Sequence, residues 1–134
     1  MSQPVPQRSI TLTIVGNDEN ADVYYTYLSP VTGLSYTNCP VCDMVADQPV
    51  NSLFVLDYVS TLNGWTITGL TPHEGSPSLQ SVPGALNASI LTINPYTSLE
   101  TYRYYIHYLN TANGAEMERD PQQGNIPKPQ PGLR

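Results

Sequence analysis

The sequence predicts an all-β fold, specifically an immunoglobulin-like antiparallel β-sandwich of about seven strands. Charged residues make up only 12% of the 134 residues and hydrophobic residues 40%, a balance that favours a folded domain without long exposed helices. The chain also contains ten Tyr, a residue that is common in strands and tolerates half-buried positions. Short strand-like segments recur between turn signals, and no segment is convincingly helical, which is typical of a β-sandwich.

Seven segments carry the strand signal, and the clearest is 9–15, where polar and apolar residues alternate. Asn63-Gly64 is a strong turn signal, so the segments on either side of it are expected to form a hairpin or meander. Residues 34–50 and 71–84 are interrupted by Pro and are expected to be loops. The other expected strands are 21–28, 52–60, 65–70, 88–94, 101–110 and 115–119.

The chain is expected to divide after residue 120. Residues 1–120 would form the sandwich domain, and residues 121–134 would form a proline-rich C-terminal tail. This tail holds four Pro and two Gly, a composition that predicts an extended segment, mobile unless it docks on the domain.

Charge and hydropathy narrow the functional classes. The net charge is −6 and all eleven acidic residues precede Pro121, so the body is a poor match for nucleic acid. The first residues do not resemble a signal peptide, and no apolar run approaches the ~20 residues that span a bilayer. The expectation is a soluble, cytoplasmic protein of bacterial type without a membrane partner. The residues leave the oligomeric state open, and a homo-oligomer is compatible with them.

The dipeptide Asp120-Pro121 is the strongest functional signal. An Asp-Pro bond is chemically the weakest ordinary peptide link, because the Asp carboxylate can attack its own carbonyl carbon and the proline nitrogen is a comparatively basic leaving group. The simpler interpretation is that Asp120 ends a strand and Pro121 blocks further pairing, since proline cannot donate to a β-ladder.

The loop before the last predicted strand decides which residue faces Asp120. A two-residue turn at Asn113-Gly114 would place His107 opposite Asp120, whereas a four-residue loop would place Tyr105 there. Both registers put Asp120 and Arg103 on one face of the sheet. A three-residue loop would reverse that face.

Cleavage at this bond needs a nucleophile or base, a group that stabilises the oxyanion and an acid that protonates the proline nitrogen. Asp120 would be the nucleophile or base, and no metal or other cofactor is required. Arg103 is the candidate cation, and Glu118 or Asp43 is a candidate second carboxylate that shares a proton. The candidate hydroxyl or imidazole donors are Tyr27, Tyr105 and His107. The alternative is that these residues form an ordinary polar face.

The segment Glu118-Arg119-Asp120-Pro121-Gln122, after an aromatic strand and an Asn-Gly turn, resembles the small bacterial DP-EP family. The chain length, the Tyr-rich segment 24–27 and the proline-rich end match as well, so the resemblance spans most of the chain. It implies a β-sandwich that cuts itself at Asp-Pro, an aspartic-type peptidase whose substrate is its own C-terminal tail. Asp120 and Pro121 carry over directly. We select Arg103, Tyr27 and Asp43 as the supporting residues.

Two further motifs suggest other functions. Cys39 and Cys42 form a CxxC, which suits zinc if His73 and His107 complete the site, or a redox pair if a helix lowers the thiol pKa. The simplest interpretation is that both Cys pack a loop. The Tyr residues and Trp65 could instead form a sugar- or peptide-binding platform, and a non-catalytic binding or structural module with a Tyr-rich surface is the alternative function.

Overall fold

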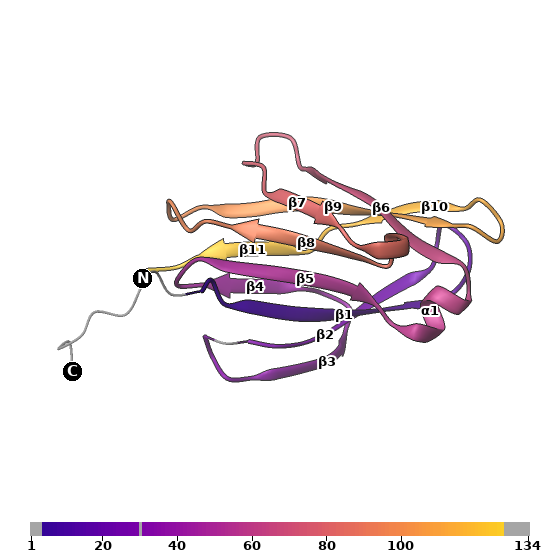
Figure 1. Ribbon diagram of the computed structural model, residues 1–134, viewed down its shortest axis with the longest axis horizontal. Helices are drawn as coiled ribbons and strands as arrows, with labels where there is room; N and C mark the ends of the chain where they lie inside the picture. Colours follow the sequence, from indigo (N-terminus) through magenta and orange to yellow (C-terminus); the bar gives the residue numbers. More distant parts are fainter. Residues whose placement is uncertain (1–3, 30, 128–134) are drawn as a thin grey trace.

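The computed structural model describes residues 4–29 and 31–127, and most of these residues lie in strands. Two sheets stack face to face and enclose a core between them (Figure 1). The predicted all-β sandwich is therefore confirmed. Its pairing is mixed, however, because each sheet contains one parallel strand pair among antiparallel ones.

The first sheet is built around the N-terminal strand. This strand pairs antiparallel with the strand that follows it in sequence and parallel with a later one. In spatial order the sheet contains β3 (Ser35–Cys39), β2 (Asp22–Leu28), β1 (Gln7–Val15), β5 (Val50–Leu56), β8 (Ser89–Asn94) and β7 (Gln80–Pro83).

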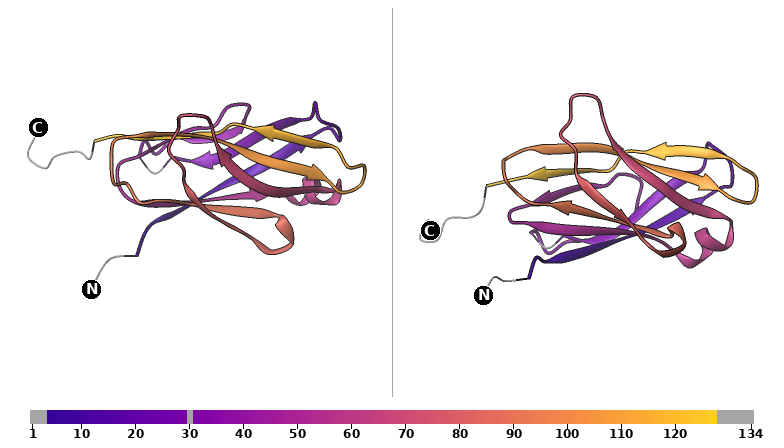
Figure 2. Two further views of the ribbon diagram at one scale, coloured as in Figure 1. Left: turned by 90° about the horizontal axis from the view of Figure 1, so that it is seen from above. Right: turned by 45° about the horizontal axis from the view of Figure 1, so that its top comes forward.

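The second sheet is built around the long strand β9 (Thr101–Asn110). β6 (Trp65–Pro72) pairs with one edge of β9. β10 (Glu116–Arg119) and β11 (Gln122–Asn125) pair with the other edge in one common register, so they are two halves of a single line interrupted at Asp120-Pro121. β4 (Asp43–Ala46) then lies parallel to β11 and forms the edge of this part of the sheet (Figure 1). The turn after β6 projects beyond the strands (Figure 2).

Strict alternation explains the core. In β1 and β9, every second side chain is buried between the sheets, and the residues between them face outward. Trp65, Phe54 and Tyr104 are among the largest fully buried side chains. Burying a large apolar side chain contributes roughly 1.5–3 kcal/mol relative to leaving it exposed. This core positions β9, and β9 in turn positions the Asp-Pro link.

Several sequence-based expectations need correction. Residues 34–50, expected to be a loop, contain β3, β4 and the start of β5, and residues 71–84, also expected to be a loop, contain the end of β6 and β7. With β11, the described residues form eleven strands instead of about seven. The expected tail begins with Pro121, which is buried, and continues as β11 inside the sheet. The sequence does not predict β11, because one Gly and two flanking Pro within a few residues are typical of a loop. Residues 128–134 of the expected tail lie outside the described residues.

The hairpin expected at Asn63-Gly64 is also wrong. β5 and β6 lie in different sheets, and the single-turn helix α1 (Tyr58–Leu62) connects them. Asp57 caps α1, because its Oδ1 accepts a hydrogen bond of 2.8 Å from the Ser60 amide. The other helical element is the 3₁₀ turn η1 (Ala85–Asn87). In the described ranges no helix is long and apolar enough to cross a membrane.

The Asp57 cap leads to a stability prediction. The Thr13 hydroxyl also donates a 2.7 Å hydrogen bond to Asp57 Oδ2, so Asp57→Ala removes two partners and should cost about 1–2 kcal/mol of unfolding free energy. Partial burial raises the pKa of Asp57, but the hydrogen bonds from Ser60 and Thr13 outweigh it and hold this pKa below its ordinary value of 3.8. The contribution that depends on charge is therefore full above that ordinary value and disappears as pH falls through the lower, folded-state pKa.

Urea unfolding of the parent and Asp57→Ala at neutral and strongly acidic pH measures this effect. We expect the difference to shrink at the acidic end. Asp22→Ala is the control, because Asp22 is also an Asp but is exposed on β2. Equal losses in both variants would argue against the capping role.

Candidate functional site

The register around Asp120 is the one that a four-residue loop produces. The Asn110 amide donates to the Ala115 carbonyl at 2.8 Å, and the Gly114 amide donates to the Asn110 carbonyl at 2.7 Å. The pairs Arg119–Ile106 and Gln122–Arg103 then flank the interruption, so Asp120 lies opposite Tyr105. The expectation that Asp120 and Arg103 share a face of the sheet is confirmed.

The two residues of the Asp-Pro link have opposite environments. The side chain of Asp120 is 64% exposed on the outer face, whereas Pro121 is buried. The Gln122 amide donates a 2.9 Å hydrogen bond to the Cys42 carbonyl, which begins the pairing with β4. The peptide bond between Asp120 and Pro121 therefore lies where the strand passes from a free edge to a fully paired position.

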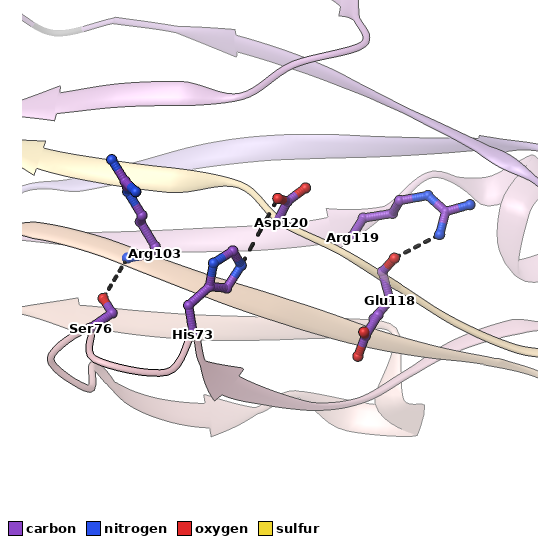
Figure 3. A network of polar contacts seen from close by, with 6 residues as sticks. All are labelled: His73, Ser76, Arg103, Glu118, Arg119 and Asp120. Atoms are coloured by element: carbon purple, nitrogen blue, oxygen red, sulfur yellow. Dashed lines mark hydrogen bonds and ion pairs between the residues drawn. The ribbon is translucent and has the colours of Figure 1, made fainter.

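His73 is the group that lies beside the Asp120 carboxylate. It belongs to a turn that follows β6, in which the His73 amide donates to the Arg103 carbonyl at 2.8 Å. The Arg103 amide donates in turn to the Ser76 hydroxyl at 2.9 Å (Figure 3). The His73 ring stacks on Tyr105 with centroids 4.0 Å apart. These contacts hold the His73 ring over Tyr105, the residue that lies opposite Asp120 in the strand pair.

The distance from His73 Nε2 to Asp120 Oδ2 is 3.9 Å (Figure 3). This is too long for a hydrogen bond but within the range of a charge pair. Nε2 is shielded from solvent and has no hydrogen-bond partner among the described residues. A small movement of the exposed Asp120 side chain would give this nitrogen its partner.

Two of the expected supporting residues lie near this pair. Arg103 and Asp43 both flank Gln122, on β9 and β4 respectively, and both are exposed. Arg103 is diagonal to Asp120 across the strand pair, a distance that a long side chain spans. Within residues 4–29 and 31–127 it forms no ion pair. Glu118 is engaged elsewhere, because its Oε2 lies 3.5 Å from His107 Nδ1.

Tyr27 does not reach the outer face. It is buried in the interior, and its ring stacks on Tyr36 at 4.8 Å. Its hydroxyl lies beside the Cys42 thiol and the Asp43 backbone. Burial, and then Cys42 and Tyr36, raise the pKa of Tyr27 to about 12, so it is a neutral core hydroxyl instead of a group of the exposed site.

Tyr25, two residues earlier, is the buried tyrosine near Asp120. Both residues line a cavity of about 180 Å³ together with Cys42 and Arg119. Burial, followed by the proximity of Cys42 and the Asp120 carboxylate, raises the pKa of Tyr25, so its hydroxyl stays protonated and can donate. The Arg119 guanidinium is held by the carbonyl of Ala21 at 2.6 Å. This cavity is large enough for several waters next to the Asp-Pro link.

Sequence reasoning missed His73 and Tyr25 as partners of Asp120. The sequence suggests His73 only as a possible zinc ligand, because the turn that carries it has no periodic pattern. Tyr25 and Tyr27 both point inward in the alternation of β2, so alternation alone cannot tell which one lies at Asp120.

Of the two CxxC residues, Cys42 is poorly suited to a reactive role. Both are free thiols, and burial raises the pKa of Cys42 to about 12, which keeps it protonated and weakly nucleophilic. In the part of the chain that the structure describes, no cluster of three or more His, Cys, Asp or Glu could hold a metal ion.

The aromatic residues considered for a binding platform lie partly in the core. Trp65 is only 1% exposed, and its indole N–H donates to the Gly16 carbonyl at 3.0 Å. Of the ten Tyr, all within the described ranges, five are buried and only Tyr58 is fully in the exposed class. Half of the Tyr residues therefore build the core.

Comparison with known proteins identifies the fold but not the activity. No protein-family model matches the chain, and no curated protein sequence matches it. Among solved structures, the chain is similar to the inclusion body protein PixA from Burkholderia cenocepacia, with a TM-score of 0.57 and 7% sequence identity. The match covers 94% of this chain and 99% of that one. At such low identity the similarity concerns the fold alone.

Proposed function

We propose that the protein is a self-cleaving peptidase of the aspartic type that hydrolyses its own Asp120-Pro121 bond. The observation that carries this proposal is the pairing of Asp120 with the shielded His73 nitrogen at 3.9 Å, directly at an Asp-Pro link. The resemblance of residues 118–122 to the DP-EP family points in the same direction.

The reaction proceeds in two stages, the formation of a cyclic anhydride and its hydrolysis. An Asp120 carboxylate oxygen attacks the carbonyl carbon of Asp120 and forms a five-membered ring with an oxyanion. The carbon–nitrogen bond then breaks, and its electron pair goes to the Pro121 nitrogen, which takes up a proton. The resulting cyclic anhydride adds one water and opens to the free side-chain and main-chain carboxyl groups. One water is consumed for each bond that is cut.

The surrounding residues suit these steps. His73 Nε2 lies 3.9 Å from the Asp120 carboxylate and is placed to bring a proton to the site. Arg103, diagonal to Asp120, contributes positive charge toward the oxyanion. The cavity with the Tyr25 hydroxyl provides a neutral donor and room for the hydrolytic water.

Intact mass spectrometry of freshly purified protein tests the proposal. The protein is kept at neutral and mildly acidic pH for days, and samples are denatured before measurement. We expect masses for fragments 1–120 and 121–134 to appear with time. A single intact mass throughout would reduce Asp120-Pro121 to a strand interruption and leave a non-catalytic β-sandwich module as the better interpretation.

Replacement of His73 should separate its chemistry from its packing. His73→Phe keeps an aromatic ring to stack on Tyr105 but removes Nε2, so we expect cleavage to slow by ~10²-fold or more, a typical loss for a proton-transfer group. The time course of the two fragments measures this effect.

Glu74→Gln is the control for this experiment. It changes an exposed neighbour in the same turn and should cleave at the parental rate. If His73→Phe also cleaves at the parental rate, His73 has no part in the reaction.

A further inference from the structure

The most unusual buried group outside the Asp-Pro site is Arg8. It lies on β1, is only 7% exposed and points between the sheets. Its acceptors are all neutral: Ser52 Oγ at 2.8 Å, the Val45 carbonyl at 2.7 Å and Gln123 Oε1 at 3.3 Å. Among the residues that the structure describes, no carboxylate lies within 4.0 Å of it.

This arrangement leaves the guanidinium incompletely satisfied. Arg has five N–H donors, and three have acceptors here, which leaves two without one in the described structure. A buried charge is costly unless an opposite charge pairs with it. Burial accordingly lowers the pKa of Arg8, and the nearby Tyr and Cys groups compensate only in part.

A cavity of about 110 Å³ adjoins Arg8. The stacked rings of Tyr27 and Tyr36 contribute to its wall, and Ser29 contributes a buried hydroxyl. The lining also includes the exposed residues Thr32 and Asp43, so the cavity reaches the surface. A water occupies roughly 30 Å³ of liquid volume, so the space suits a ligand of about four heavy atoms.

We propose that this cavity is a binding site for a small monocarboxylate, whose two oxygens face the free N–H donors of Arg8. Arg recognises carboxylates through two parallel hydrogen bonds, and the aromatic wall accommodates a short apolar remainder. Asp43 on the rim disfavours ligands with a second negative charge. The proposal does not depend on cleavage at Asp120-Pro121.

Saturation-transfer NMR with acetate as the probe tests this site on the intact protein. When the aromatic protons are saturated, the signal of the acetate methyl group should decrease. This effect should reach a plateau as the acetate concentration rises, and formate should abolish it by displacing acetate. Chloride at equal ionic strength should not displace it, and malonate should bind more weakly. No saturable transfer, or equal displacement by chloride, would overturn the proposal.

Variants assign the effect to Arg8. Arg8→Lys retains the charge but loses the planar fork, so acetate should bind about tenfold or more weakly. Arg103→Met removes an exposed Arg on the outer face and should leave acetate binding unchanged. Equal binding by Arg8→Lys and the parent would contradict the assignment.

Asp43→Asn keeps Arg8 and guards against loss of folding in the Arg8 variant. Removal of the rim charge should tighten acetate binding severalfold. If acetate binds only to Asp43→Asn and not to the parent, Asp43 itself neutralises Arg8 and the proposed ligand site does not exist.

Discussion

Asp120→Ala is expected to abolish cleavage of the chain, so that a single intact mass persists for as long as the parent yields two fragments. The methyl group cannot attack the carbonyl, and no anhydride can form. Asp120→Asn should slow cleavage by at least ~10²-fold, because the amide is a poor nucleophile and cannot exchange a proton with His73. Both variants alter an exposed side chain, so the fold should tolerate them.

The control must remove a carboxylate from the same face without touching the link. Glu116→Gln does this, since Glu116 is exposed on β10 and belongs to the same outward row as Asp120. Intact mass spectrometry of denatured samples should give parental kinetics for Glu116→Gln. If Asp120→Ala yields the two fragments as fast as the parent, the mechanism is wrong.

The parts of the fold that the sequence predicted are those with strict alternation over many residues. β1 and β9 bury every second side chain, so their period of two is visible without any structure. β3 and β4 are short, and β3 has no buried residue, so neither leaves a pattern of that kind. Parallel pairing of β11 with β4 involves residues far apart in the chain, which local signals cannot reveal.

The candidate site could likewise be predicted only where strand alternation determines it. The position of Asp120 and its shared face with Arg103 followed from strand periodicity and one loop length. The partner His73 did not, because a turn between β6 and β7 brings it over β9 by tertiary packing. The position of Tyr25 beside Asp120 could not be predicted for a related reason, because alternation gives the face of a residue but not its neighbour in the other sheet.

The second large effect concerns Gln123, the buried centre of β11. Its side chain accepts from Arg8 and donates to Tyr104 at 2.9 Å and Thr92 at 3.1 Å. Gln123→Leu has a similar volume but leaves these buried polar groups without their partner, so we expect a loss of about 2–4 kcal/mol in unfolding free energy. Gln122→Leu, the outward-facing neighbour, should change it by less than ~0.5 kcal/mol. Urea unfolding of the three proteins at neutral pH measures both values.

The same contacts determine what becomes of a cut chain. β11 is paired with β9 on one side and β4 on the other, so fragment 121–134 should stay bound to fragment 1–120 after hydrolysis. Native mass spectrometry of fully cleaved protein should show one complex, and denatured samples two fragments. In Gln123→Leu the complex should dissociate more readily than in Gln122→Leu. Spontaneous release of the fragment from cleaved parental protein would mean that the buried contacts of β11 do not keep the fragment bound.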